Sequence, residues 1–78
     1  MNSRQALLYT RAGCHLCDQA QQVLEDNGFL VRAVDIDDHP DLQQRYHECV
    51  PVVFIDGKER FRGRVDAVLL RRLLASKG

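Results

Sequence analysis

The chain has 78 residues, of which 45% are hydrophobic, and its 11 basic and 11 acidic side chains cancel. This length allows one domain with a small core, and the apolar content is too high for a disordered chain. A net charge of zero leaves no global field to attract nucleic acid or an anionic membrane, so we expect neither as a partner. The first ten residues carry a single positive charge and only a short apolar run, which fits neither a signal peptide nor a membrane span. We therefore expect a cytoplasmic protein.

The first half of the chain predicts a strand, a helix and a second strand. Residues 6–10 form a short uncharged run that is typical of a strand buried on both faces. After a turn at 11–13, apolar side chains recur at spacings of three and four and predict one buried helix face. These side chains are Leu16, Cys17, Ala20, Val23 and Leu24. Asn27-Gly28 is a helix-ending pair, and the β-branched and aromatic residues of 29–36 predict the second strand.

The second half predicts a short helix, a hairpin and a closing helix. Residues 37–47 begin with acidic candidates for a helix cap and place Pro40 in the first turn. Residues 52–55 form a third strand, which a turn at Asp56-Gly57 connects to a charged edge strand at 59–62. The last helix is expected at 65–77. Its predicted stripe contains Val65, Val68, Leu69, Arg72 and Leu73, widened by Ala67, Leu70 and Leu74.

The order of these elements, β-α-β-α-β-β-α, defines the expected fold class. A helix between the first two strands implies that they are parallel and joined by a right-handed crossover, whereas the last two strands form a hairpin. We therefore expect an α/β fold in a single domain over residues 1–78. A four-stranded mixed sheet with helices on both faces would bury these patterns.

Cys14 and Cys17 form a Cys-x-x-Cys pair for which three kinds of chemistry are possible. A structural disulfide scaffold needs more cysteines and an oxidising compartment. Structural zinc takes four ligands, and without a second Cys-x-x-Cys pair a site would need Cys14, Cys17, Cys49 and a histidine. The third possibility is a redox dithiol. It suits the position of the pair, between the first strand and the start of the first helix.

A helix N-terminus stabilises an anion and lowers the pKa of a thiol there from ~8.5 towards ~3.5 to 7.5. Cys14 is then the expected nucleophile, and Cys17, on the apolar stripe, is the expected buried resolving thiol. His15 is either a cation that favours the thiolate or an exposed helix-start residue. Arg11 is either a surface residue or a partner for a carboxylate of a thiol substrate. Pro51 belongs at the first residue of a strand, since it lacks a backbone donor.

Four segments occur in order between Leu7 and Leu74: TRAGCHLC, VDIDDHPDL, VPVVFIDG and GRVDAVLL. In these segments the sequence resembles the thioredoxin superfamily, and within it the glutaredoxins. It is similar to the short bacterial glutaredoxin-like proteins with a Cys-His-Leu-Cys motif. The resemblance implies a thioredoxin-like fold of the glutaredoxin type and a redox-active disulfide that serves cell redox homeostasis.

The resemblance also implies roles for single residues near the dithiol. Cys14 would be the nucleophile and Cys17 the resolving thiol. Pro51 would be a cis-proline that faces them, and Val50 would offer its backbone to the cysteinyl part of a substrate.

Two further residues correspond to glutathione-binding positions in glutaredoxins. Arg11 would bind a glutathione carboxylate, and Asp66 would bind the γ-glutamyl end. The Gly-Gly-Cys-Asp of glutaredoxins stands here as Gly63-Arg64-Val65-Asp66. The candidate substrate or glutathione-binding residues are therefore Arg11, His15, Val50, Pro51 and Asp66.

We expect a monomeric thiol–disulfide oxidoreductase, an enzyme that reduces disulfides in a protein or a small thiol substrate. Glutathione or a protein reductase would restore its dithiol, and no resident cofactor or metal is expected. Two alternatives remain. One is a metal or iron–sulfur carrier that uses Cys14, Cys17 and Cys49, because thiolates favour zinc, copper(I) and such clusters. The other is a redox-inactive binding module with the same fold.

Overall fold

A computed structural model describes residues 4–47 and 49–75 of the chain. Its elements are β1 (Arg4–Thr10), α1 (His15–Asp26), β2 (Phe29–Asp35), the 3-10 turn η1 (Ile36–Asp38), α2 (Pro40–Tyr46), β3 (Val52–Ile55), β4 (Lys58–Arg62) and α3 (Ala67–Ala75). The predicted order of strands and helices is confirmed, with η1 as an addition between β2 and α2. No helix in the described ranges is long and apolar enough to cross a membrane.

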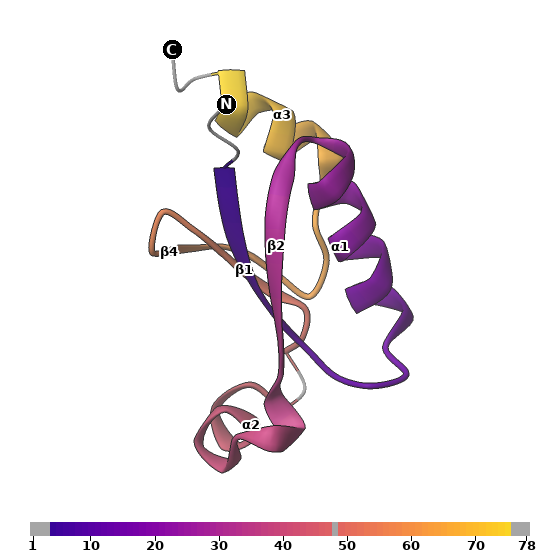
Figure 1. The fold of residues 1–78 in the computed structure, drawn as a ribbon, viewed down its shortest axis with the longest axis vertical. Helices are drawn as coiled ribbons and strands as arrows, with labels where there is room; N and C mark the ends of the chain where they lie inside the picture. Colours follow the sequence, from indigo (N-terminus) through magenta and orange to yellow (C-terminus); the bar gives the residue numbers. More distant parts are fainter. Residues whose placement is uncertain (1–3, 48, 76–78) are drawn as a thin grey trace.

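The four strands form one mixed sheet in the order β2-β1-β3-β4 (Figure 1). β1 pairs in parallel with β2 and antiparallel with β3, and β3 pairs antiparallel with β4. Asp56 and Gly57 close the β3–β4 hairpin with φ angles of +56° and +79°, the left-handed values that a two-residue hairpin turn of this type requires. The expected α/β fold class is therefore confirmed.

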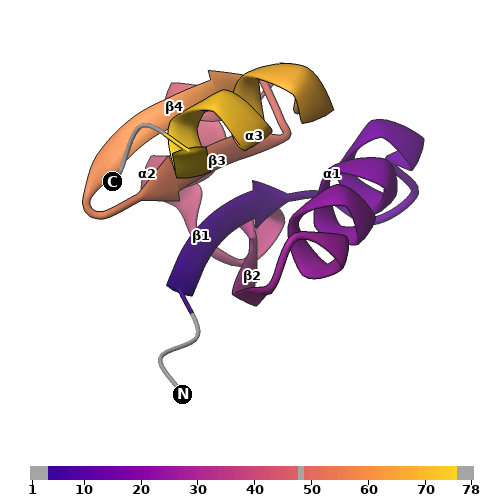
Figure 2. The ribbon, with the colours of Figure 1, turned by 90° about the horizontal axis from the view of Figure 1, so that it is seen from above.

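One face of the sheet is covered by α1 and α3 (Figure 2). The core on this face contains Ala6, Leu8, Ala20, Leu24, Phe29, Val53, Ile55, Phe61 and Leu70. Alternation along β1 and β3 directs these strand residues to one side, and helical spacing brings Ala20 and Leu24 onto them. Burial of a side chain such as Leu24, which is 0% exposed, contributes ~1.5–3 kcal/mol.

The opposite face is covered by α2 only towards one end. Its smaller core consists of Ile36, Tyr46 and Val52, with the Tyr9 ring packed against Tyr46 and Phe54. In Figure 1, α2 lies beyond the lower end of the strands, and the molecule measures 38 × 21 × 18 Å. The remainder of this face carries an open hollow of about 960 Å³, whose lining includes Leu7, Leu30, Arg32 and Phe54. Helices therefore lie on both faces, as predicted, but they cover them unequally.

The helices differ from the sequence prediction in three details. α3 starts at Ala67, and its fully buried residue is Leu70, whereas Val68 and Leu69 of the predicted stripe are 58% and 50% exposed. Leu16 of the predicted α1 stripe is also exposed, at 47%. The expected acidic cap of α2 is wrong as well: α2 starts after His39 without a side-chain cap, and the carboxylate of Asp35 caps η1 instead.

Four connecting segments meet the sheet at the same end, and three of them carry candidate site residues. Thr10 at the end of β1 pairs with Asp35 at the end of β2, and Tyr9 pairs with Val52, the first residue of β3. Val52 in turn pairs with Arg62, the last residue of β4. We call this end of the sheet the dithiol end. The β1–α1 loop and the segment after β4 leave the sheet here, and the segment before β3 enters it here.

Candidate redox site

The cysteine pair lies at the start of α1, at the dithiol end. Cys14 is the N-cap of α1, and a disulfide joins it to Cys17, with a Cα–Cα distance of 5.2 Å that suits a disulfide. The backbone N–H of Cys17 donates to Cys14 Sγ at 3.1 Å. A sulfur atom in this position accepts one of the N–H groups that a helix N-terminus leaves without an intrahelical partner. The same contact and the helix dipole stabilise a thiolate at Cys14.

The two sulfur-bearing residues differ in burial. Cys17 is 1% exposed and faces the interior, as its position on the apolar stripe predicts, whereas Cys14 is only partly buried. The left-handed φ of +78° at Gly13 turns the chain from β1 into the helix just before the pair.

The segment before β3 brings Val50 and Pro51 to the same end of the sheet. The Val50–Pro51 peptide bond is cis; Pro51 is buried and Val50 is partly buried. The backbone N–H of Gly63 donates to the carbonyl oxygen of Pro51 at 2.8 Å. This hydrogen bond joins the proline segment to the segment that leads into α3.

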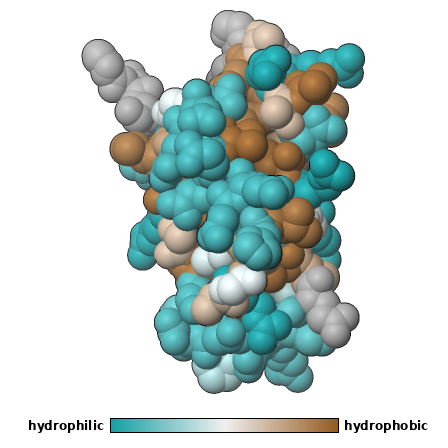
Figure 3. All heavy atoms as spheres, turned by 90° about the vertical axis from the view of Figure 1, so that its right-hand side faces the viewer, coloured by the Kyte–Doolittle hydropathy of each residue, from teal (hydrophilic) through white to brown (hydrophobic). Residues whose placement is uncertain are grey.

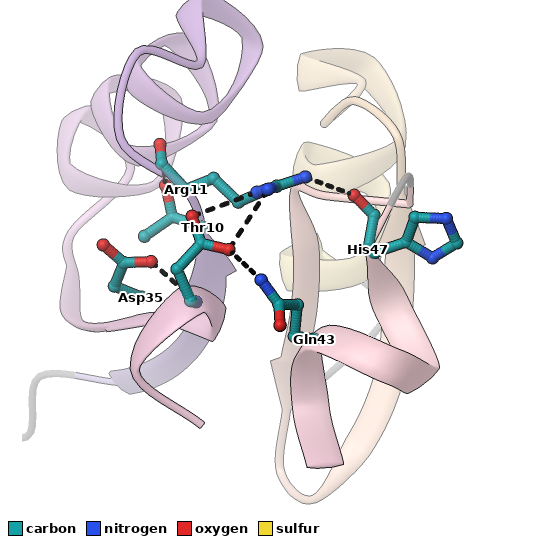
Figure 4. A network of polar contacts seen from close by, with 6 residues as sticks. Thr10, Arg11, Asp35, Gln43 and His47 are labelled. Carbon is teal, nitrogen blue, oxygen red and sulfur yellow. Dashed lines mark hydrogen bonds and ion pairs between the residues drawn. The ribbon is translucent and has the colours of Figure 1, made fainter. Parts of the chain in front are cut away.

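Arg11 is held in a polar network rather than presented to solvent alone (Figure 4). Its Nε lies 3.2 Å from Asp37 Oδ2 and its Nη2 lies 3.1 Å from Asp37 Oδ1, while Nη1 donates to the carbonyl oxygen of His47 at 2.8 Å. Gln43 also donates to Asp37 Oδ1, at 2.8 Å. The hydrogen bonds from Arg11 and then Gln43 hold the pKa of Asp37 below its ordinary value of 3.8. We call these four residues the Arg11 clamp, since it joins the β1–α1 loop to η1 and α2.

Asp66 lies just before α3 and caps that helix. Its Oδ1 accepts the backbone N–H groups of Val68 at 2.9 Å and Leu69 at 3.3 Å. The carboxylate is therefore held at the N-terminus of α3 and is exposed on the surface. His15, the first residue of α1, is exposed as well.

Cys49 contacts Arg62, a residue 13 positions away that no sequence pattern connects to it. Arg62 Nη1 lies 3.6 Å from Cys49 Sγ, and the same guanidinium pairs with Glu59 at 2.9 Å and lies over the Tyr46 ring. The hydrogen bond and charge of Glu59 raise the pKa of Arg62 above its usual range. Within residues 4–47 and 49–75, no group of three His, Cys, Asp or Glu side chains is placed to hold a metal ion.

Comparisons with known proteins agree with this geometry. The family described as Glutaredoxin-like domain (DUF836) matches residues 5–75. The uncharacterised protein Rv0508 of Mycobacterium tuberculosis is 32% identical over 84 aligned positions, which cover 96% of this chain and 87% of that protein. The X-ray structure of protein XcR50 from X. campestris is 35% identical and has a TM-score of 0.78, with 91% of this chain and 96% of that chain covered. The NrdH-redoxin of Escherichia coli shares the fold at 22% identity, with a TM-score of 0.68 over 88% of this chain and 93% of that one.

The mixed sheet and the disulfide-linked cysteine pair at the start of its first helix are those of a glutaredoxin-like domain, and the pair supports thiol–disulfide exchange as its general chemistry. The chain belongs to the glutaredoxin-like domain family.

Proposed function

We propose that the protein is a dithiol disulfide reductase in which Cys14 is the nucleophile and Cys17 the resolving thiol. The observation that carries this proposal is the unequal setting of the two sulfur atoms. Cys14 is partly exposed and accepts a helix N–H at 3.1 Å, whereas Cys17 is 1% exposed. A substrate therefore reaches Cys14 first, and Cys17 lies one helical turn behind it.

The exchange takes place in two balanced steps. In the first, the Cys14 thiolate attacks one sulfur of the substrate R–S–S–R′, a Cys14–S–S–R bond forms, and R′–S⁻ leaves and takes a proton. In the second, the Cys17 thiolate attacks Cys14 Sγ and releases R–S⁻, which is protonated in turn. The substrate gains two electrons, and the protein is left with the Cys14–Cys17 disulfide seen in the structure.

The cycle needs an external thiol reductant, either two molecules of glutathione or the dithiol of a protein reductase. Glutathione would be a co-substrate, and the exchange itself uses no resident cofactor. In this proposal Val50 presents its backbone to the substrate next to Pro51, and His15 lies beside the attacking sulfur. For Arg11 to meet a substrate carboxylate, it would have to exchange its contacts with Asp37, which makes a protein reductant the stronger candidate.

The test is a turnover assay with a neutral aromatic disulfide, with either glutathione or dithiothreitol as the reductant. Cys14→Ser should lower the activity to background. Cys17→Ser should accumulate a mixed disulfide on Cys14, visible by mass spectrometry as the added mass of half the substrate.

The natural control is Cys49→Ser, which removes the remaining thiol of the chain. Equal residual activity in Cys14→Ser and Cys17→Ser would contradict the assigned roles. An inactive wild-type protein with both thiols reduced would contradict the proposed function itself.

A further inference from the structure

Arg11 and Cys14 belong to the same short loop between β1 and α1, so the charge of Arg11 bears on the exchange chemistry. Three residues of chain span at most ~11 Å, and the left-handed turn at Gly13 shortens this distance. Such a separation is close to the Debye length of ~8 Å at physiological ionic strength. A cation without a partner at this position would therefore attract small thiols and disulfides that carry carboxylates.

The structure gives each nitrogen of the Arg11 guanidinium an acceptor. Nε and Nη2 form a bidentate pair with the carboxylate of Asp37, at 3.2 and 3.1 Å, and Nη1 donates to the carbonyl oxygen of His47 at 2.8 Å. Figure 4 shows the Arg11 side chain extended from its loop towards His47 at the end of α2. Two parallel hydrogen bonds between an arginine and a carboxylate fix the side-chain geometry, and the two charges cancel.

Asp37 is itself held in place, so its carboxylate is an internal competitor for Arg11. The backbone N–H of Asp37 donates to Asp35 Oδ1 at 2.9 Å, and Gln43 donates to Asp37 Oδ1 at 2.8 Å. The hydrogen bonds from Arg11 and Gln43 hold the pKa of Asp37 below 3.8, so the carboxylate is ionised at neutral pH. A carboxylate from solution would have to displace one that the fold keeps at a high effective concentration.

The neighbours of the Arg11 clamp in the chain add further negative charge. Asp35 and Asp38 flank the turn that contains Asp37, and Asp38 is exposed. Figure 3 shows that the surface at the α2 end of the molecule is largely hydrophilic. An anionic thiol that approaches this end of the molecule therefore meets a neutralised arginine and additional carboxylates.

We propose that Asp37 is a positioning residue that sets the charge preference of the exchange site. By holding Arg11 in the clamp, Asp37 keeps this cation from binding a carboxylate of a substrate. The preferred partners of the Cys14–Cys17 pair are then thiols and disulfides without a carboxylate close to the reacting sulfur. The inference rests on the proposed disulfide exchange and names its substrate class. The bonds that form and break are those of that exchange, and Asp37 changes only which partner is favoured.

The test compares two aromatic disulfides that differ in charge. Dithiodipyridine is neutral, whereas dithiobis(nitrobenzoate) carries a carboxylate on each half. In the reduced protein Cys14 attacks either compound, Cys17 closes the protein disulfide, and both halves leave as coloured thiols. Stopped-flow absorbance therefore gives the second-order rate. Every protein in the comparison carries Cys49→Ser, so that only the pair reacts, and the protein with this change alone is the reference.

We expect Asp37→Asn to raise the rate with the anionic disulfide about three- to five-fold, the upper range for an exposed charge pair, since Arg11 becomes free to bind a carboxylate. The rate with dithiodipyridine should stay within about two-fold, whereas a purely structural role of Asp37 would change both rates together. Adding Arg11→Gln to Asp37→Asn should cancel the gain. The gain should also shrink at an ionic strength of about 1 M, where the Debye length falls to ~3 Å.

Asp38→Asn is the matched control, because it removes the same charge from the same turn and leaves the Arg11 clamp intact. Its rate with the anionic disulfide should rise by less than about two-fold, since a distant exposed charge is screened. Asp37→Ser is a second variant without the carboxylate, since serine suits a turn position. It should show the same gain as Asp37→Asn.

Two results would overturn the inference and leave the proposed function standing, provided that dithiodipyridine reacts rapidly. One is an equal gain in Asp38→Asn and Asp37→Asn, and the other is the absence of a gain in both Asp37 variants. If the reduced reference protein reacts with neither disulfide, the proposed function fails and the inference fails with it.

Discussion

Two cysteines three positions apart have different environments because one is a helix cap and the other is a core residue. Cys14 lies outside the first helical turn, where the N–H of Cys17 points at its sulfur. Cys17 is directed inwards by the 3.6-residue period that also buries Ala20 and Leu24. The proposed division between attacking and resolving thiol rests on this difference in helix geometry.

His15 provides a test of the electrostatic environment of Cys14. It is exposed and adjacent to the helix cap, so a positive charge on its ring would favour the thiolate. We expect His15→Ala to raise the pKa of the Cys14 thiol in the reduced protein. The measurement is the pH dependence of alkylation at Cys14, followed by mass spectrometry. His39→Ala is the control, since His39 is also an exposed histidine and is the N-cap residue of α2. An unchanged pH dependence of alkylation in His15→Ala would show that His15 has no influence on the pKa of the Cys14 thiol.

Cys49 provides a test that separates a reductase from a metal carrier. Its sulfur lies 3.6 Å from the guanidinium of Arg62, and a fixed cation there opposes binding of a metal cation. We expect Cys49→Ala to leave disulfide exchange largely intact. Wild-type protein purified without oxygen should contain less than about a tenth of an equivalent of zinc or iron, because a closed thiolate site needs more converging ligands. A stoichiometric metal that is lost in Cys49→Ala would support the carrier instead.

At the scale of elements, the Arg11 clamp should make the thermal stability of the protein depend on pH. The pKa of Asp37 is held below its ordinary value of 3.8, chiefly by the hydrogen bond from Arg11. A carboxyl group with a depressed folded-state pKa stabilises the fold above its unfolded pKa, and this contribution is lost as the pH falls through the folded pKa. We expect wild type to melt at a higher temperature than Asp37→Asn at neutral pH, with the difference shrinking below pH 3.8.

The control for this experiment is Asp38→Asn. The Asp38 carboxylate makes no hydrogen bond or ion pair with the described residues, although it follows Asp37 in the same turn. A melting difference for Asp37→Asn that is the same at every pH would show that the Arg11 clamp does not act through the charge of Asp37.

The position of α3 on the sheet can be tested with two neighbouring leucines. Leu70 is 0% exposed in the main core, whereas Leu69 is 50% exposed. Leu70→Ala should lower the free energy of unfolding by ~2–5 kcal/mol, since it removes buried methyl groups and leaves a cavity. Leu69→Ala should change it by no more than ~0.5 kcal/mol. Denaturant titration of both variants measures the difference, and equal losses would contradict the observed orientation of the helix.

Strands could be predicted from the sequence more accurately than helix faces. Residues 52–55 were predicted as a strand and form β3, because four apolar residues between a proline and a turn allow little else. The orientation of α3 was missed, since Ala67-Val68-Leu69-Leu70 is apolar at every position and leaves the rotation of the helix undetermined. The spacing of Leu16 fits a buried helix face, but its side chain is 47% exposed, whereas the adjacent Cys17 is 1% exposed.

The cysteine pair of the site could be predicted, but most of its surroundings could not. A Cys-x-x-Cys pair at a strand-to-helix junction is a local pattern, and the helix it caps follows from local spacing. Arg11 and Asp37 are 26 positions apart, and they meet only because β1 and β2 end side by side. Cys49 and Arg62 meet for the same kind of reason, through the β3–β4 pairing. Such contacts depend on the sheet register, which no single segment specifies.

At the scale of the whole molecule, the order of the strands places the chemistry at one end of a long body. The segments around Cys14, Pro51 and Asp66 all leave the sheet at the dithiol end, while the β3–β4 turn lies at the opposite end. The large hollow near that turn contains none of the cysteines among its lining residues. Substitutions there, such as Leu30→Ser, therefore probe stability and surface properties separately from exchange.

The central place of β1 in the sheet has a consequence for the motions of the backbone. β1 is hydrogen-bonded to a neighbour on each side, whereas β2 and β4 each have one free edge within the described sheet. Amide protons exchange with solvent only when such bonds open, so those of Leu7 and Leu8 should exchange more slowly than those of the edge strands. Deuterium uptake measured by NMR should show this order. The loop that carries Cys14 is thus attached to one of the two interior strands, and fraying of either edge of the sheet should leave its attachment in place.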